Sequence, residues 1–158
     1  MKRAITFIER LSLWGASLSA VFMVLIVVII AVEIVLRSVF NTSTLIADEY
    51  SAYFFVGVVL LGLAFTLKEE AHIRITLLTS LLGKRGKGVL DTMATIAAMA
   101  ITTFALYHTS LMVYESWELG MRADTISETP IYLSQVVIPA GLIMFDLQLA
   151  ARFLKRLL

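Results

Sequence analysis

The amino-acid sequence predicts an all-α membrane protein with four transmembrane helices and short amphipathic helices at the membrane surface. Hydrophobic residues make up 59% of the chain, charged residues make up 16%, and mean hydropathy is +0.91. A typical soluble domain carries about 25% charged residues, so this chain has too little polar surface for a globular protein in water. Four long runs carry no charge apart from Asp146. We therefore expect a single membrane domain over residues 1–158.

The four uncharged runs are long enough to cross a bilayer as helices. About 20 apolar residues cross ~30 Å of hydrocarbon, and a helix satisfies its backbone hydrogen bonds internally. The predicted helices cover residues 11–36, 50–67, 89–114 and 130–154. The first run is longer than the apolar region of a signal peptide, and no small-residue cleavage pattern follows it. We therefore interpret it as a membrane span.

Two flanking segments have the pattern of helices that lie on the membrane surface. Residues 2–10 place apolar side chains on one side and Lys2, Arg3 and Arg10 on the other. In residues 72–82, isoleucine and leucine recur at a four-residue spacing until a glycine breaks the pattern. Such segments are too short to span the bilayer and have the hydrophobic side of an interfacial helix. Both are predicted to lie along the inner membrane surface.

Lysine and arginine are distributed unequally among the connections. Of 13 basic residues, eleven lie in the N-terminal segment, in the connection between the second and third helices, and in the C-terminal segment. The other two, Arg37 and Arg122, lie in the remaining connections, which are acidic. Because cytoplasmic loops are enriched in lysine and arginine, both termini are predicted to be cytoplasmic.

The composition excludes several classes of function. The chain has no cysteine, so disulfides, thiolate metal sites and c-type haem attachment are excluded, and its net charge of +1 argues against a nucleic-acid partner. The two histidines, His72 and His108, are expected ~25 Å apart in depth, too far to share one haem iron. The sequence has no catalytic triad, metal motif or glycine-rich phosphate loop. We predict no catalytic, cofactor-binding or metal-binding residue and expect His108 to pack between helices.

Acidic side chains stand at the outer ends of the first two helices. Glu33 and Arg37 are spaced i, i+4 with the acid first, which favours a helix ion pair. Two roles fit this pair: it ends the first helix, or it also docks a partner. Asp48 and Glu49 precede the second helix, where the positive end of the helix dipole attracts acids. Capping alone would explain them.

The last helix contains two prolines and one acid. Pro130 suits its first turn, with Thr129 as the cap. Pro139 lies inside the helix and removes one backbone hydrogen bond, so a kink is expected, either as a packing feature or as a gate. Asp146 is an acid within a spanning run and is expected in the inner third of the membrane. A structural hydrogen-bonding role and a transport role both fit it.

The stretch KEEAHIRIT at residues 68–76 combines several charges with one histidine between apolar segments. We expect it where the second helix leaves the membrane and the chain turns along the inner surface. His72 and Arg74 then suit lipid headgroups and a neighbouring subunit, and we interpret the stretch as a joint rather than an active site.

These residues, in their order and spacing, carry a resemblance to a known family. EIVLRSVFN at residues 33–41, which ends on Asn41, is followed by DEYSAYFFVGVVLLGLAFTLKEEAHIRI at 48–75 and VVIPAG at 136–141. Trp117, Gly120, Thr125 and Pro130 lie between the last two stretches. Over nearly the whole chain this resembles the small membrane subunit of tripartite ATP-independent periplasmic (TRAP) transporters, the DctQ-like family. The chain departs from the family at Ile46 and Ala47, where a tryptophan is common, and at Thr76, where an aspartate is common.

The resemblance implies a scaffold subunit of a secondary transporter in the bacterial inner membrane. A periplasmic substrate-binding protein captures an organic acid, and a large membrane subunit carries it across together with sodium. The small subunit would pack against the large one, contact membrane lipids, help dock the binding protein, and bind neither substrate nor ion. A free-standing four-helix scaffold or a small proton-coupled exporter is the alternative. The residues expected to serve structure or interaction are Glu33, Arg37, Asn41, Asp48, Glu49, His72, Arg74, Pro130, Pro139 and Asp146.

Overall fold

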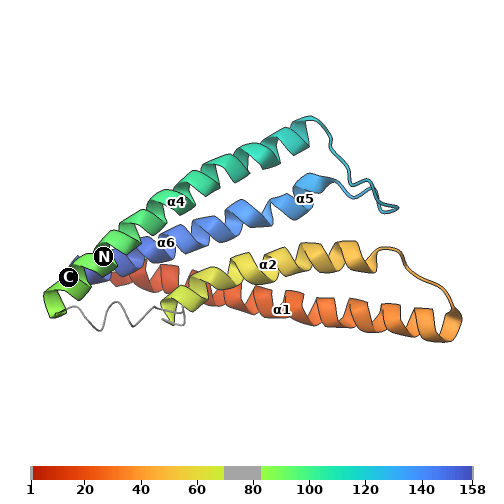
Figure 1. The fold of residues 1–158 in the computed structure, drawn as a ribbon, viewed down its shortest axis with the longest axis horizontal. Coiled ribbons are helices and arrows are strands. Elements are labelled where there is room, and N and C mark those ends of the chain that lie inside the picture. Colours follow the sequence, from red (N-terminus) through yellow and green to blue (C-terminus); the bar gives the residue numbers. More distant parts are fainter. Residues whose placement is uncertain (1, 70–82, 158) are drawn as a thin grey trace.

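The structure is a computed structural model that describes all residues except 1, 70–82 and 158. Its regular elements are helices: α1 (Lys2–Phe40), α2 (Ala47–Lys68), α4 (Lys84–Glu118), α5 (Ile131–Gln135) and α6 (Val137–Leu157) (Figure 1). Four stretches within them are long and apolar enough to cross a membrane: Arg3–Phe40, Ala47–Lys68, Gly86–Glu118 and Ile131–Lys155. The predicted all-α fold with four long apolar helices is confirmed, and these helices are candidate membrane spans by length and composition.

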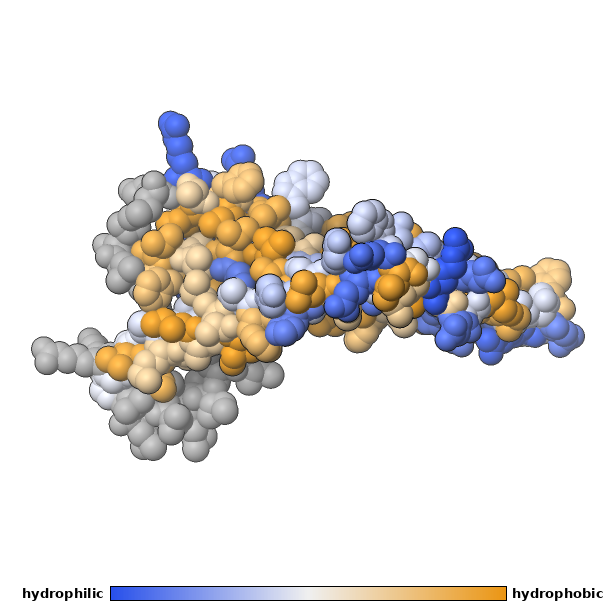
Figure 2. All heavy atoms as spheres, turned by 90° about the horizontal axis from the view of Figure 1, so that it is seen from above, coloured by the Kyte–Doolittle hydropathy of each residue, from blue (hydrophilic) through white to orange (hydrophobic). Residues whose placement is uncertain are grey.

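Helix α6 lies at the centre of the arrangement. It packs against α1, α2 and α4, whereas α4 packs chiefly on α6 and the short α5. The chain termini lie together at one end, which we call the terminal end, and the α1–α2 and α4–α5 turns lie at the other, the turn end (Figure 1). Hydrophobic side chains cover much of the face shown in Figure 2, and hydrophilic ones gather toward the turn end.

Helix α1 is longer than predicted. A separate surface helix over residues 2–10 was expected before a span over 11–36, but a single helix of 39 residues runs from Lys2 to Phe40. No proline interrupts this stretch, and the apolar side of its first turns continues onto the bundle, where Ile5 is buried. At a rise of 1.5 Å per residue the helix is about 58 Å long, well beyond the hydrocarbon thickness. The other predicted surface segment, residues 72–82, lies outside the described residues.

Contacts between α1 and α2 fix their antiparallel register. The rings of Phe22 and Phe54 are 5.2 Å apart, and the Ser19 hydroxyl donates to the Val58 carbonyl at 2.8 Å. Continuing this register places the start of α2 level with about residue 30 of α1. The last ~10 residues of α1 therefore extend about 15 Å past α2 at the turn end.

One residue, Val136, separates α5 from α6 in the turn before Pro139, and the kink expected at this proline stays a prediction. Val136 keeps right-handed helical dihedral angles (φ −60°, ψ −23°), and its N–H donates to the Tyr132 carbonyl at 3.0 Å. Pro139 has no N–H to donate to the Gln135 carbonyl, so the separation of α5 from α6 falls in the turn preceding the proline. Thr129 was predicted to cap this helix, and that is wrong. The residue at the cap position is Pro130, and no side chain caps the helix.

Small residues in the core of the bundle let the helix backbones approach closely. At Gly141, a β-carbon would lie 2.8 Å from the backbone of Leu60 on α2, closer than side chains tolerate. Ala64 on α2 and Ala151 on α6 are fully buried. Since hydrocarbon gives no hydrophobic drive between membrane helices, such close van der Waals packing holds them together.

Substitution of Gly141 tests this contact. Gly141→Ala should lower the free energy of unfolding in detergent by about 1–3 kcal/mol, because the added methyl group pushes α6 away from the α2 backbone. The matched control is Gly88→Ala in α4, where a β-carbon meets nothing within 4 Å. That change should leave stability equal or slightly raised. Equal melting temperatures for the two variants would contradict the packing argument.

Candidate functional site

Glu33 anchors the turn between α1 and α2. The residue is only 6% exposed, and its carboxylate accepts hydrogen bonds from Arg37 Nε at 2.7 Å, from the Ser43 hydroxyl, and from the hydroxyl and N–H of Thr44 at 2.6 and 3.1 Å. The predicted Glu33–Arg37 ion pair is confirmed. The hydroxyl contacts were not predicted, although a serine and threonine close behind the helix end could have signalled them.

The same turn holds backbone conformations that L-residues rarely adopt. Asn41, where α1 ends, has φ 48°, and Leu45 has φ 59°. Asparagine tolerates this region, but leucine is strained there. The Leu45 N–H donates to the Ser43 hydroxyl oxygen at 3.2 Å, so the Glu33–Ser43 contact and the strained residue belong to one network. The leucine side chain is left exposed at the turn end.

Glu49 anchors the turn between α4 and α5 through hydrogen bonds, as Glu33 anchors the turn between α1 and α2. It accepts hydrogen bonds from the hydroxyls of Tyr53 at 2.7 Å, Thr125 at 2.6 Å and Ser127 at 2.8 Å. Asp48 and Glu49 do lie in the first turn of α2, where the helix dipole favours acids. Capping alone was expected to explain them, and for Glu49 this is wrong, because its carboxylate binds a turn more than 70 residues away in sequence.

The α4–α5 turn is further ordered by its own backbone. Met121 and Ile131 are joined by an N–H···O bond of 3.1 Å, and the Ala123 N–H donates to the Thr129 carbonyl at 3.0 Å. The Thr129 hydroxyl lies 3.2 Å from the Tyr50 hydroxyl of α2. This turn is therefore held against α2 rather than left as a free loop.

Polar contacts also join three helices at the terminal end. Arg152 of α6 pairs with Asp91 of α4 at 3.6 Å, and Lys155 of α6 pairs with Glu9 of α1. One turn further in, the buried hydroxyl of Ser12 donates to Gln148 Oε1 at 3.0 Å. The two ends of the bundle are thus cross-linked by side chains, and the middle relies mainly on packing.

The carboxylate of Asp146 is bound within the apolar part of the bundle. It accepts hydrogen bonds from the hydroxyls of Thr102 and, at 3.2 Å, Thr103, both on α4. These threonines stand at the middle of the uncharged run 92–114, so Asp146 lies opposite the middle of α4. Its expected depth in the inner third of the membrane stays a prediction. The contact supplies the hydrogen-bonding role that was expected of this residue.

The two histidines do not form a site with each other. His108 was predicted to pack between helices, but it is exposed on α4, where its ring contacts Phe104 at 4.4 Å and Tyr107 at 5.3 Å. The prediction failed because α4 packs chiefly on α6, which leaves most of its circumference without a neighbour. His72 and Arg74 lie outside the described residues.

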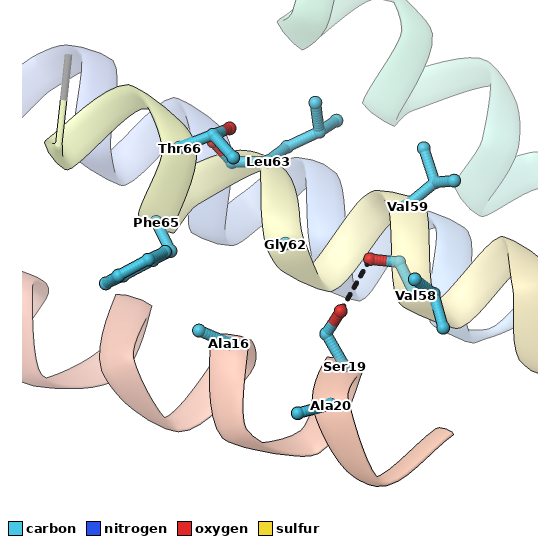
Figure 3. Close-up of a pocket in the computed structure, with 9 residues that line it drawn as sticks. All are labelled: Ala16, Ser19, Ala20, Val58, Val59, Gly62, Leu63, Phe65 and Thr66. Atoms are coloured by element: carbon cyan, nitrogen blue, oxygen red, sulfur yellow. Dashed lines mark hydrogen bonds between the residues drawn. The ribbon is translucent and has the colours of Figure 1, made fainter. Parts of the chain in front are cut away.

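A hollow of about 420 Å³ opens between α1 and α2, lined mainly by small and aliphatic residues such as Ala16, Ala20 and Gly62 (Figure 3). Its hydroxyls, Ser19 and Thr66, donate to backbone carbonyls of α2, and no charged side chain lines it. Among residues 2–69 and 83–157, no group of three or more His, Asp or Glu side chains is placed to hold a metal ion. The polar groups that are present bind one another across helices.

Four apolar helices joined by polar contacts at their ends define a small multi-pass membrane subunit. The model of the family described as "Tripartite ATP-independent periplasmic transporters, DctQ component" matches residues 26–158. The chain belongs to this family, whose members are transporter permease subunits and not enzymes. It is similar to a TRAP transporter small permease protein of Haemophilus influenzae, with 22% identity over 120 residues that cover 76% of this chain and 73% of the relative. No solved structure matches the chain.

Replacement of Glu33 and of Arg37 in turn distinguishes two contributions to stability: the hydrogen bonds that anchor the α1–α2 turn and the Glu33–Arg37 ion pair. Glu33→Ala removes the acceptor of four hydrogen bonds and should lower the melting temperature in detergent by several degrees, with faster proteolysis of the α1–α2 turn. Arg37→Ala should have a much smaller effect, because the Arg37 side chain is 58% exposed and an exposed ion pair contributes little. If the two variants melt alike and the turn stays protected in both, the anchor assignment is wrong.

Proposed function

We propose that this chain is the scaffold subunit that packs against the large membrane subunit of a sodium-coupled TRAP transporter for an organic acid. The complex would stand in the bacterial inner membrane and receive substrate from a periplasmic binding protein. The observation that carries the proposal is the family match over residues 26–158. A tripartite family implies partner components, and in such a complex the large subunit would hold the substrate and sodium sites.

The exposed surface of α4 supports a membrane partner. Phe104, Tyr107, Tyr114 and Trp117 are all more than half exposed along this helix, beside the exposed His108. An imidazole turned toward lipid in a spanning segment is unfavourable, whereas a neighbouring protein helix can hydrogen-bond it. This surface is therefore suited to contact with another subunit.

The distribution of charge supports an orientation. Basic residues from the N-terminal segment, the start of α4 and the C-terminal segment gather at the terminal end, which we place in the cytoplasm. The turn end then faces the periplasm. There the last turns of α1, with Val39, Phe40 and the strained Leu45 exposed, reach past α2 toward the other components. We infer that this projection helps to dock the binding protein or the outer surface of the large subunit.

Single cysteines in this cysteine-free chain test the orientation. Gly86→Cys at the terminal end should resist a membrane-impermeant thiol reagent in intact cells, and Ile126→Cys at the turn end should be labelled. Ile126 is 72% exposed, whereas Gly120 in the same turn has φ 60° and would strain a cysteine. Both positions should react after the cells are permeabilised. Labelling of position 86 in intact cells would reverse the proposed orientation.

The position of Asp146 opposite the middle of α4 favours one alternative, a small proton-coupled exporter that uses this carboxylate as its coupling group. Asp146→Asn removes the titratable proton but keeps hydrogen bonding to Thr102 and Thr103. A scaffold subunit with this change should support at least half of wild-type uptake in proteoliposomes containing all three components, normalised to assembled complex. An exporter should lose all turnover, because coupling depends on the proton. Loss of transport by a fully assembled variant would favour the exporter.

A further inference from the structure

Asp146 stands at a seam between α4 and α6 that is open to the outside of the bundle. Thr103, one of its two partners, is exposed, and Asp146 itself is only partly buried. On α6 the neighbouring side chains Ile143 and Leu147 are exposed and apolar. The carboxylate therefore forms a polar spot in an apolar surface opposite the middle of α4, rather than part of the core.

The hydrogen bonds within the chain do not satisfy this carboxylate. An ionised carboxylate offers about four acceptor positions, whereas each threonine hydroxyl has one proton to donate. The Thr102 hydroxyl also lies 2.8 Å from the Ala98 carbonyl and 3.3 Å from the Met99 carbonyl, so its single proton is contested. The two threonines of α4 therefore fill at most two of the four acceptor positions.

A partly satisfied carboxylate is unfavourable against lipid. An aspartate within a membrane-spanning helix is unfavourable on insertion scales, and acyl chains have no donor to reduce that cost. Charged residues inside the membrane accordingly face a bundle interior or a protein partner. The exposed side of Asp146 calls for a hydrogen-bond donor that approaches from outside the chain at the same depth.

We propose that Asp146, with Thr102 and Thr103, is the point at which a helix of the large membrane subunit docks through a hydrogen-bond donor. This inference rests on the proposed function and names the place of contact within it. The donor is a hydroxyl, amide or basic side chain flanked by apolar residues that pack on Ile143 and Leu147. A donor on a helix fits the need for satisfied backbone hydrogen bonds within the membrane.

Affinity purification of the complex tests the proposal. The chain is co-expressed with the large subunit of its transporter, and the large subunit recovered per small subunit is measured over a dilution series. Asp146→Leu should weaken assembly about tenfold, the scale of one or two interhelical hydrogen bonds, and Asp146→Asn should stay within about threefold of wild type. The matched control is Ser110→Ala, because the exposed Ser110 hydroxyl donates to the Leu106 carbonyl of its own helix. Full recovery with Asp146→Leu would overturn the inference.

A second measurement guards against misfolding of Asp146→Leu. A photoactivatable residue at Leu147 leaves Asp146 intact and should give an adduct with the large subunit. An adduct with a second copy of this chain, or with lipid alone, would overturn the docking point even where the wild-type complex is recovered. If the wild-type chain recovers no large subunit at all, the proposed function fails and the docking point fails with it. The two failures are thus distinguished by the wild-type purification.

Discussion

The contact between α6 and α2 at Gly141 is the constraint on which the arrangement of the other helices depends. No side chain fits between the two backbones there, since a β-carbon would lie 2.8 Å from Leu60. With α6 held this close to α2, its remaining faces are left for α1 and α4. The short α5, which precedes α6 in the chain, packs on α4 as α6 does. Van der Waals contact between small residues thus decides which faces of the bundle stay open.

Carboxylates at the turn end act through hydroxyl groups more than through ion pairs. Glu33 and Glu49 each bind at least two hydroxyls, and those hydroxyls come mainly from the turns that follow α1 and α4. In a region of lower dielectric than water, an unpaired carboxylate is costly, and several short donors satisfy it without bringing in a second charge. The turns are fixed as a consequence, even where Leu45 adopts a strained backbone conformation. A rigid turn end is a surface that a second protein can recognise without first ordering it.

The sequence was sufficient for the features that follow from local physics. Uncharged runs predicted the four apolar helices, and the i, i+4 spacing predicted the Glu33–Arg37 pair. Features that depend on which helix lies beside which were missed. The partner of Glu49 is a threonine in a distant turn, and His108 is exposed because α4 has chiefly one neighbour. Neither follows from a periodicity, because hydrophobic patterning in a membrane helix does not distinguish lipid from protein.

Polar side chains that the bundle leaves exposed indicate contact with another protein. His108 is exposed on α4, and Asp146 is only partly buried where α6 meets α4, so the bundle encloses neither polar group. Apolar residues around them can be covered by lipid or by protein, but the polar groups need donors and acceptors that acyl chains lack. The structure therefore has most of its interhelical polar contacts at its ends, where Glu33 and Glu49 bind hydroxyls and Arg152 and Lys155 pair with acids, and it leaves polar groups exposed along α4. A subunit of a larger membrane complex is the arrangement that reconciles these two properties, because association supplies the missing polar partners.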